Sequence, residues 1–372
     1  MIHYAPPDAP LDRALLDAPG GFAWWYVDLV DDQGSGLVLI WSFGLPFLPG
    51  YAGAAREGHA QAPRSRPSIN LALYTRGRPD CYVLQEYAPD QVVWEPGTER
   101  CVFGDSVLET AERDGIREVR ADLVLPLPGT DTPLEARLLA AGPACRAGGP
   151  LPGFGGADRA HAWTPLLTAC TGSASLRVGN TWATRLEGRL YHDRNGSARP
   201  LHDLGIDHWI WGRVAAPDGE RVVYLVWGHG EDTPAAAGFE VDADGGLRQV
   251  PELEVELEGP RRHLYGMRDW RALTLNSAGA PWLRLSTAHL LDNGPFYLRY
   301  LLDAELPDRT RCRGIGEAVR PDRVDLVNLR PFVRMRVHRL RGLNEPLLPL
   351  FTGPRRGRLG RLWTHVVHPE AS

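Results

Sequence analysis

Short apolar runs separated by glycine and proline dominate this chain. The runs are rich in Val, Leu, Trp and Tyr and have the length of β-strands. They lie at Phe22–Leu29, Leu37–Phe43, Ile69–Thr75, Cys81–Tyr87, Val222–Trp227, Trp282–Thr287 and Phe332–Leu340. Only Pro321–Leu329 has a helical pattern, with proline in its first turn and Val324 and Val327 three residues apart. The pattern predicts a mainly β protein of the sandwich or barrel type.

The length of 372 residues corresponds to about two domains. We predict an N-terminal β domain over residues 1–205 and a C-terminal β domain over residues 206–372, with the junction near the aromatic block His208–Trp211. The polar stretch Asp193–Pro200, which precedes this block, is interpreted as a turn. Asn195–Ser197 within it has the form of a glycosylation acceptor and is interpreted as part of the same turn.

The composition excludes several kinds of chemistry. The sequence contains no lysine, so all 41 basic residues are arginine, which excludes Schiff-base catalysis and the phosphate-binding lysine of a P-loop. The five cysteines are odd in number, widely spaced and without a Cys-x-x-Cys pair, so they indicate neither a disulfide framework nor a zinc-thiolate site. Because no secretory signal is visible at the amino terminus, we expect a reducing, cytoplasmic location.

Charge is distributed unevenly along the chain. The net charge of −5 argues against a nucleic-acid partner, yet Arg309 to Arg361 holds fourteen arginines and four acidic residues. The last of these arginines lie among large apolar residues, namely Leu350, Phe351, Leu359, Leu362 and Trp363. One interpretation is a solvated face whose arginines pair with acidic parts of the same chain. The other is peripheral contact with the anionic inner face of a membrane.

A second apolar stretch, Leu37–Ala55, carries no charge but is interrupted by proline and glycine. We interpret it as a strand followed by an apolar loop. This loop is either part of the core or a hydrophobic lip that contacts a lipophilic ligand or a membrane.

Two short motifs carry the candidate chemistry, His161-x-Trp163 and Tyr191-x-Asp193. Residues two apart in a strand point to the same side, so Tyr191 and Asp193 share a face while His192 points to the other. Two such strands present a carboxyl, a phenol, an imidazole and an indole to one cavity. This set is suited to moving a proton and stabilising a cation, although a purely structural Tyr–Asp hydrogen bond is the alternative.

The order and spacing of these motifs resemble the carotenoid 1,2-hydratases, also called hydroxyneurosporene synthases. Further blocks match in the same order, and the resemblance covers roughly residues 20 to 340. These blocks are Gly20–Asp28, Asn70–Tyr74, Gln85-Glu86, Phe103–Ser106, His208–Trp211 and Asp292–Tyr297.

The resemblance implies two lipocalin-like, calycin-type antiparallel β-barrel or sandwich domains with few short helices. It further implies a cofactor-independent, acid-catalysed addition of water to the terminal double bond of an acyclic carotenoid or similar isoprenoid. Asp193 then corresponds to the proton donor, with His161, Trp163 and Tyr191 as its functional neighbours. Burial in an apolar pocket would raise the pKa of Asp193 enough to keep its proton near neutral pH.

Aromatic residues within the matching blocks are candidates for binding this hydrophobic substrate. The predicted set is Trp24, Trp25, Tyr26, Asn70, Trp209, Trp211, Phe296 and Tyr297. Alternation places Trp24 and Tyr26 on the face opposite Trp25, so one set lines a pocket while the other packs in a core. We predict no metal site, because the histidines and aspartates near Asp193 lack any ligand spacing.

Two other functions remain open at the level of sequence. A lipocalin-like cyclase or pericyclase would use the same pocket to shape a polyene. A non-catalytic carotenoid- or lipid-binding protein would only hold it.

Overall fold

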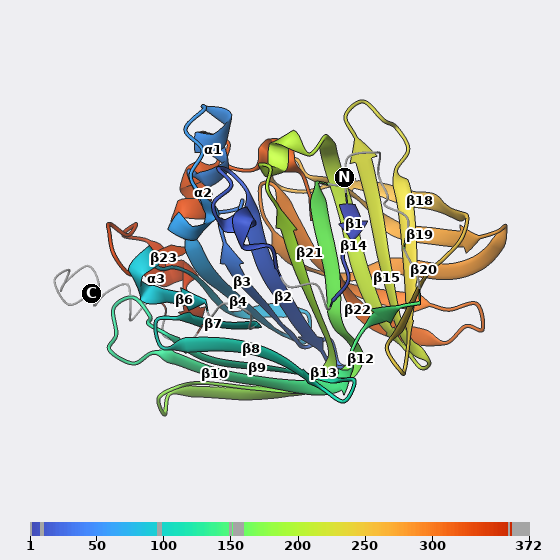
Figure 1. Cartoon of the computed structure of the whole chain (residues 1–372), viewed down its shortest axis with the longest axis horizontal. Coiled ribbons are helices and arrows are strands. Elements are labelled where there is room, and N and C mark those ends of the chain that lie inside the picture. The colour runs from blue at the N-terminus through green and yellow to red at the C-terminus, as the bar shows by residue number, and fades with distance from the viewer. Residues whose placement is uncertain are drawn as a thin grey trace.

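Two large curved β-sheets make up the protein (Figure 1). The computed structural model describes residues 2–7, 11–94, 99–148, 151, 160–355 and 358. In space the first sheet, of 14 strands, runs β23-β5-β4-β3-β2-β13-β12-β10-β9-β8-β7-β6, with β1 added to β12 and β24 to β5. The second sheet, of ten strands, runs β11-β17-β16-β15-β14-β22-β21-β20-β19-β18. The prediction of an all-β fold is confirmed.

The longest strands of the first sheet form its centre. Its strands are β1 (Ile2–Tyr4), β2 (Phe22–Val30), β3 (Gly36–Phe43), β4 (Pro67–Thr75), β5 (Arg78–Glu86), β6 (Val92–Trp94), β7 (Glu99–Phe103), β8 (Ser106–Arg113), β9 (Ile116–Leu125), β10 (Leu134–Pro143), β12 (His161–Val178), β13 (Trp182–Ser197), β23 (Val337–Arg339) and β24 (Gly353–Pro354). Successive strands pair antiparallel with their neighbours over most of this sheet, and β12 and β13 form one long hairpin.

The second sheet follows the same antiparallel plan. Its strands are β11 (Arg146–Ala147), β14 (Ile206–Ala216), β15 (Gly219–Gly228), β16 (Ala235–Asp242), β17 (Gly246–Gln249), β18 (Leu253–Arg262), β19 (Arg268–Ser277), β20 (Ala280–Asn293), β21 (Tyr297–Glu305) and β22 (Arg311–Val319). The described helices are short: α1 (Tyr51–Arg56), α2 (Arg330–Arg334), α3 (Leu348–Phe351) and single 3₁₀ turns.

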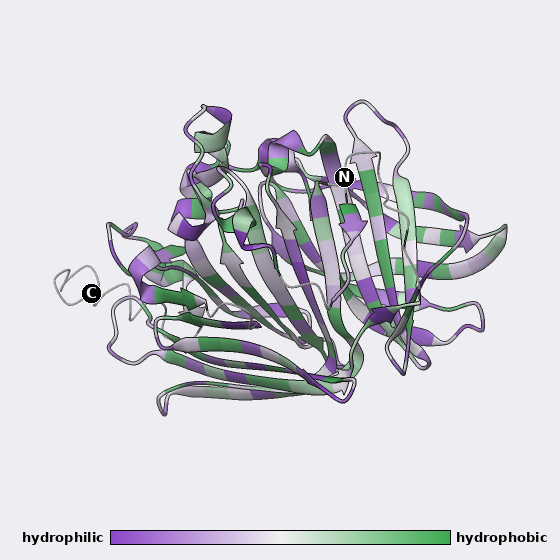
Figure 2. Cartoon of the chain, in the orientation of Figure 1, coloured by the Kyte–Doolittle hydropathy of each residue, from purple (hydrophilic) through white to green (hydrophobic). Residues whose placement is uncertain are grey.

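Three apolar cores fill this architecture. One lies inside the curl of the first sheet, one inside the curl of the second, and the third lies between the two sheets, with side chains from both. Figure 2 shows the apolar and polar positions alternating along the strands. Strands β2 and β3 are buried at every position because both of their faces are covered, which explains why their sequences are nearly unbroken apolar runs.

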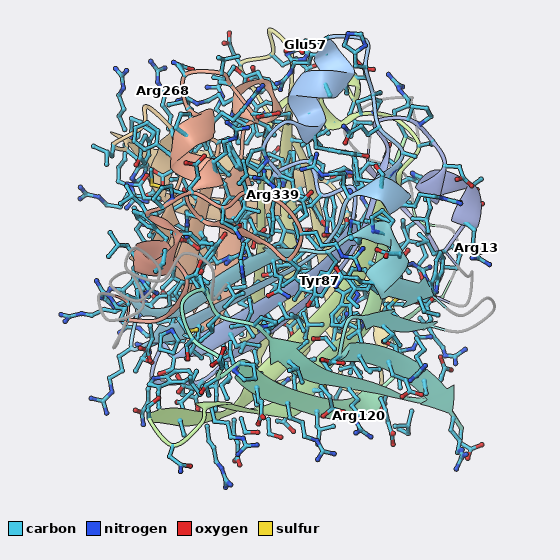
Figure 3. All side chains as sticks on the ribbon, turned by 90° about the vertical axis from the view of Figure 1, so that its left-hand side faces the viewer. Arg13, Glu57, Tyr87, Arg120, Arg268 and Arg339 are labelled. Atoms are coloured by element: carbon cyan, nitrogen blue, oxygen red, sulfur yellow. The ribbon has the colours of Figure 1, made fainter. Side chains whose placement is uncertain are left out.

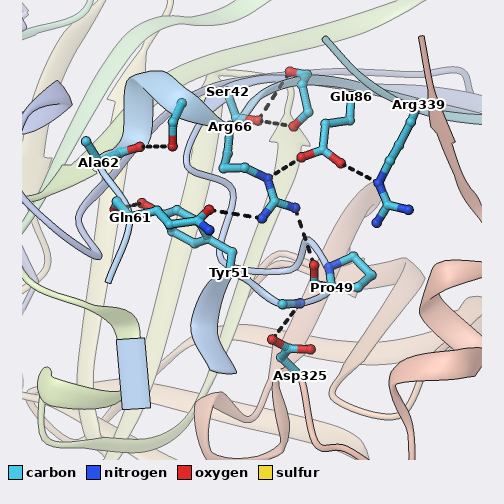
Figure 4. Close-up of polar contacts among 12 residues, drawn as sticks. Ser42, Pro49, Tyr51, Gln61, Ala62, Arg66, Glu86, Asp325 and Arg339 are labelled. Atoms are coloured by element: carbon cyan, nitrogen blue, oxygen red, sulfur yellow. Dashed lines mark hydrogen bonds and ion pairs between the residues drawn. The ribbon is translucent and has the colours of Figure 1, made fainter. Parts of the chain in front are cut away.

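The predicted helix over Pro321–Leu329 is wrong. Only a 3₁₀ turn forms at Pro321–Arg323, and Asp325 adopts a left-handed backbone with φ 58°. The Asp325 carboxylate accepts hydrogen bonds from the backbone N–H groups of Gly50 (2.7 Å) and Gly53 (2.8 Å) at the start of α1. Figure 4 shows this contact beside Pro49. A tertiary contact therefore overrides the local helical pattern.

The predicted strand Phe332–Leu340 is correct only in part. Its first residues belong to α2, and only Val337–Arg339 forms a strand, which pairs parallel with β5. Arg339 Nε lies 3.1 Å from Glu86 Oε2, and the same carboxylate pairs with Arg66 (Figure 4). These contacts place the C-terminal segment against the first sheet, as Figure 1 also shows.

The turn predicted at Asp193–Pro200 is also wrong in its first half. Strand β13 continues to Ser197 because it stays paired with β2, with Asn195 opposite Trp24 and Ser197 opposite Phe22. The chain leaves the sheet only after Ser197. Asn195 therefore continues the alternation that begins at Tyr191 and Asp193.

Strands are exchanged between the two halves of the chain. Strands β23 and β24 join the first sheet from the C-terminal end, and β11 joins the second sheet through β17. The division at residues 205 and 206 stays a prediction.

Five of the fourteen arginines of the C-terminal region pair with acidic residues from other parts of the chain, in line with the first interpretation of its charge. The pairs are Arg313–Asp303 (3.3 Å), Arg320–Asp207 (3.1 Å), Arg336–Asp292 (3.4 Å), Arg339–Glu86 (3.1 Å) and Arg341–Asp90 (2.6 Å). In Figure 3 the labelled side chains of Arg13, Glu57, Arg120 and Arg268 lie at the edge of the molecule. The described residues do not include Arg356, Leu359, Arg361, Leu362 and Trp363.

Among the helices that the structure describes, none has the length and apolar character needed to cross a bilayer.

One buried arginine connects the two sheets. Arg213 on β14 pairs with Asp28 on β2 and with Glu220 on β15, and all three side chains are fully buried. Its guanidinium also donates to the backbone oxygen of Arg189 on β13 (3.0 Å). Burial raises the pKa of Asp28, and the Arg213 charge opposes that rise.

Replacing Arg213 with methionine tests this connection. Arg213→Met should lower the free energy of unfolding by about 3–5 kcal/mol, because two carboxylates stay buried without a cation. The loss should be smaller at acid pH, where Asp28, with its raised pKa, takes up a proton. Urea unfolding measures both effects. Arg341→Met, which removes the exposed pair with Asp90, is the control and should change stability little; equal effects of the two substitutions would contradict the role given to Arg213.

Candidate active site

Three neighbouring strands bring the two sequence motifs together. Strand β13 lies between β2 and β12, so Asp193 is opposite Tyr26 on one side and Pro165 on the other. Trp163 is opposite Asn195 in the β12–β13 pairing. Both motifs therefore lie on the same part of the first sheet, on the face that contacts the second sheet. The predicted common face of His161, Trp163, Tyr191 and Asp193 is confirmed by this geometry.

The Asp193 carboxyl group accepts hydrogen bonds at both oxygens. Tyr191 Oη donates to Oδ2 at 2.8 Å, and Trp163 Nε1 donates to Oδ2 at 3.0 Å. Asn195 Nδ2 donates to Oδ1 at 2.9 Å. Trp163 Nε1 also lies 3.0 Å from Tyr191 Oη. These contacts hold the carboxyl group in one orientation on a rigid strand.

Burial controls the ionisation of Asp193, which is 2% exposed. Removal from water raises its pKa from 3.8 to about 8, while the hydrogen bonds from Tyr191 and Trp163 act in the opposite direction. The charges of Glu317 and Asp28 add to the rise. The pKa of Tyr191 is raised well above its ordinary value, first by burial and then by Asp193. At neutral pH the site therefore holds a carboxylic acid beside a neutral phenol.

His161 contacts Asp193 through Asn195 rather than directly. Its Nε2 lies 3.0 Å from Asn195 Oδ1. Burial lowers the pKa of His161 to about 4, so the imidazole is neutral at physiological pH. In the described part of the chain its Nδ1 has no hydrogen-bond partner. Phe22 and Trp24 pack edge-on against the ring.

A small cavity of about 50 Å³ opens beside Asp193. Side chains from both sheets line it, and the apolar and aromatic ones predominate. The lining residues are Ile2, Trp24, Tyr26, Ile40, Leu45, Phe47, His161, Asp193, Asn195, Trp209, Trp211, Tyr224, Glu317 and Val319. A cavity of this volume has room for a few water molecules or for the end of a hydrophobic chain.

The predicted binding residues divide into two groups. Trp24, Tyr26, Trp209 and Trp211 line the cavity. The other four do not. Phe296 and Tyr297 pack against Phe47, with ring centroids 5.3 and 5.9 Å from its ring. Trp25 lies on the opposite face of β2 and donates a hydrogen bond to Glu99, and Asn70 donates one to the backbone oxygen of Val83. The alternation of β2 separates Trp25 from its neighbours in the sequence.

Several residues of the site were missed by sequence reasoning. Asn195 was detectable, because it continues the i, i+2 series of Tyr191 and Asp193. Leu45 and Phe47 belong to the apolar stretch in which a hydrophobic lip was one of two interpretations. Glu317 and Tyr224 come from the second sheet, and no pattern in the sequence links them to Asp193. Within the described residues, no group of three or more His, Cys, Asp or Glu side chains is placed to hold a metal ion.

Comparison with known proteins places the chain among carotenoid-modifying enzymes by sequence similarity. The sequence model of the carotenoid hydratase CrtC matches residues 155–345, more than half of the chain. A hydroxyneurosporene dehydrogenase of Chlorobaculum tepidum is 27% identical over 335 residues, which are 82% of this chain and 84% of that protein. An acyclic carotenoid 1,2-hydratase of Thiocapsa roseopersicina is 28% identical over 305 residues, which are 80% of this chain and 68% of that protein.

A solved structure shows the same fold. The crystal structure of an AttH-like protein of Nitrosomonas europaea has a TM-score of 0.58 and 17% sequence identity, over 85% of this chain and 99% of that one. This likeness concerns the fold alone and confirms the predicted lipocalin-like architecture. The match to the sequence model extends over more than half of the 372 residues, and the protein therefore belongs to the carotenoid hydratase family.

Proposed function

We propose that this protein adds water to the terminal C=C bond of an acyclic carotenoid or similar isoprenoid by acid catalysis, without a cofactor. Asp193 is the proton donor and water is the nucleophile. As a member of the carotenoid hydratase family the protein is a hydro-lyase. The observation that carries the proposal of acid catalysis by Asp193 is its buried carboxyl group, which has its pKa raised to about 8 and faces an aromatic cavity.

Protonation of the alkene demands an acid that keeps its proton at neutral pH. An ordinary aspartic acid is ionised there, whereas the desolvated Asp193 is not. Tyr191 and Trp163 both donate to Oδ2, which favours the anion left after proton transfer. They therefore stabilise the product side of the protonation step and orient the acid. His161 and Asn195 extend this hydrogen-bonded chain and help to orient the carboxyl group.

The protonated substrate is a tertiary carbocation, and the cavity wall suits such a charge. The rings of Trp24, Tyr26 and Trp211 line the cavity and can face the cation, an interaction worth about 2 kcal/mol per ring when desolvated. Trp163 does not line it, so its role in this proposal is to hold Asp193 rather than to face the cation. The apolar side chains of Leu45 and Phe47 leave room for the hydrocarbon end group.

Peripheral membrane contact of the basic C-terminal segment belongs to the same proposal. The described start of this segment is anchored, since Gly353–Pro354 pairs with β5 and the backbone N–H of Arg355 donates to Asp80. Arginines mixed with Leu350 and Phe351 have the chemistry to meet anionic lipid, in which a carotenoid would also reside.

The acid is tested by Asp193→Asn, which keeps the shape of the side chain but cannot donate a proton as an acid. Hydration should fall roughly 100- to 10,000-fold, the usual contribution of a general acid. Mass spectrometry of products formed from a lycopene- or neurosporene-type substrate in ¹⁸O-labelled water measures it. The wild type should gain one labelled hydroxyl per modified end. An isomeric product without label would indicate cyclisation instead.

Asp203→Asn is the matched control, because Asp203 is half-exposed and lies outside the cavity. It should hydrate at the wild-type rate. Full activity in Asp193→Asn, with the fold intact by circular dichroism, would exclude Asp193 as the proton donor.

The pH dependence follows from the raised pKa of Asp193. Because the acid works only when protonated, kcat/KM should fall above about pH 8, by about tenfold per pH unit. The same shift makes the folded state retain a proton that the unfolded chain has released. The stabilising contribution of Asp193 is thus complete below pH 3.8 and is lost as pH rises to about 8. Urea unfolding of the wild type should show this loss, and Asp193→Asn should not. A rate that rises between pH 7 and 9 would contradict the assignment.

A further inference from the structure

A second carboxyl group faces the cavity from the opposite sheet. Glu317 on β22 lines the same cavity as Asp193, although 124 residues separate them in the sequence. Its side chain is 13% exposed. In the second sheet Glu317 lies directly opposite Trp211 on β14 and Arg299 on β21. The cavity therefore contains one carboxyl group from each sheet.

Glu317 is held in place by a buried arginine. Arg299 Nε donates to Glu317 Oε1 at 3.1 Å. Arg299 is 2% exposed, and its Nη1 donates to Tyr74 Oη at 2.7 Å, which in turn donates to Asp292 at 2.6 Å. The hydrogen bond from a buried guanidinium is a strong one and fixes the Glu317 carboxyl group in position. Among the described residues Asp193 is instead held by Tyr191, Trp163 and Asn195, and by no arginine.

The cavity wall also carries polar atoms without a protein partner. Trp211 Nε1 and His161 Nδ1 are buried and make no hydrogen bond within the described residues. Buried polar atoms of this kind are usually satisfied by water. Since Trp211 is the cross-strand neighbour of Glu317, an N–H donor and a carboxylate acceptor stand side by side. A water molecule there can accept from the indole and donate to the carboxylate.

We propose that Glu317 is the general base of the hydration reaction, which takes a proton from the attacking water, and that Trp211 positions this water. The proposal rests on the function assigned above to Asp193. It gives the two carboxyl groups of the cavity separate roles, one as acid from the first sheet and one as base from the second.

Hydration takes place by protonation of the alkene and capture of the resulting cation by water. The Asp193 O–H bond breaks and its proton forms a C–H bond with the less substituted alkene carbon, while the π electrons leave a tertiary cation. The water oxygen forms a C–O bond to that cation, and one water proton passes to Glu317. The product is the tertiary alcohol, with Asp193 ionised and Glu317 protonated. Transfer of a proton from Glu317 to Asp193 through cavity water restores both groups.

Several charged or titratable groups face Glu317 and enter any pH profile. Arg299 and Tyr297 come from β21, Tyr26 from β2, Tyr224 from β15 and Asp193 from β13. The pKa values of the three tyrosines are raised by burial, so they stay neutral in the working range. Arg299 stays charged. Asp193, whose pKa is raised to about 8, changes its ionisation within that range.

Glu317→Gln tests the proposal in the full-length protein. Hydration should fall at least roughly 100-fold, the usual contribution of a general base. The decline of the rate above about pH 8, which reflects Asp193, should be retained. Glu240→Gln is the matched control, since Glu240 is 14% exposed, pairs with Arg221 and Arg248, and lies outside the cavity. This control should keep wild-type activity.

Incubation in D₂O separates this proposal from the function on which it rests. Glu317→Gln should still form the cation, fail to capture it with water, and return substrate that carries deuterium at the vinylic carbon of its end group. Asp193→Asn should incorporate none. If the wild type does not hydrate, the proposed function itself fails. If the wild type hydrates, two results for Glu317→Gln would overturn the base assignment alone. One is hydration within about twofold of the wild-type rate, and the other is loss of deuterium incorporation together with hydration.

Glu317→Asp covers the case in which the glutamine variant does not fold, judged by circular dichroism and thermal unfolding. It keeps the carboxylate one methylene further from the water, so hydration should be reduced but stay above that of Glu317→Gln. Loss of deuterium incorporation together with hydration in this variant would overturn the role of Glu317. Trp211→Phe should lower kcat more than it raises KM, because it removes the N–H group but keeps an aromatic wall; an effect on KM alone would exclude positioning of the water.

Discussion

The burial of Arg213 between two sheets is the constraint on which the rest of the structure depends. This one guanidinium pairs with Asp28 from the first sheet and Glu220 from the second, and it donates to the backbone of β13. Glu220 in turn accepts from the N–H of Ala169, where β12 has an irregular register. Charges this deep are tolerated only when they are paired, so the two sheets have to meet in one arrangement.

A water-poor contact between the sheets follows from that arrangement. The face of β13 that carries Tyr191 and Asp193 is covered by aromatic side chains of β14 and β15, which exclude solvent. Without this cover Asp193 would be an ordinary surface carboxylate, ionised at neutral pH. The same cover leaves Glu317 beside Asp193 but paired with Arg299. The contact between the sheets thus places two carboxyl groups at one cavity with different hydrogen-bond partners.

Features that depend on near neighbours in the chain were predictable. Alternation correctly separated Trp24 and Tyr26 from Trp25, and Tyr191 and Asp193 from His192. The apolar runs correctly located β2, β3, β4, β5, β15 and β20. In β2 and β3, burial on both faces leaves a nearly continuous apolar signature. The helix expected after Pro321 failed because the Asp325 carboxylate is held by backbone N–H groups 272 and 275 residues away. Local propensity cannot contain a contact of that range.

Chain periodicity and composition therefore decide the all-β class, the shared face of the His161–Trp163 and Tyr191–Asp193 motifs, and the exclusion of lysine chemistry. Only the folded arrangement decides which face of each strand becomes a site. It brings Glu317, Trp211 and Tyr224 from the second sheet to the acid of the first, and leaves Trp25 and Asn70 outside the cavity. The physical reason is that ionisation and access depend on desolvation, which is set by the side chains packed against a residue and not by its neighbours in the sequence.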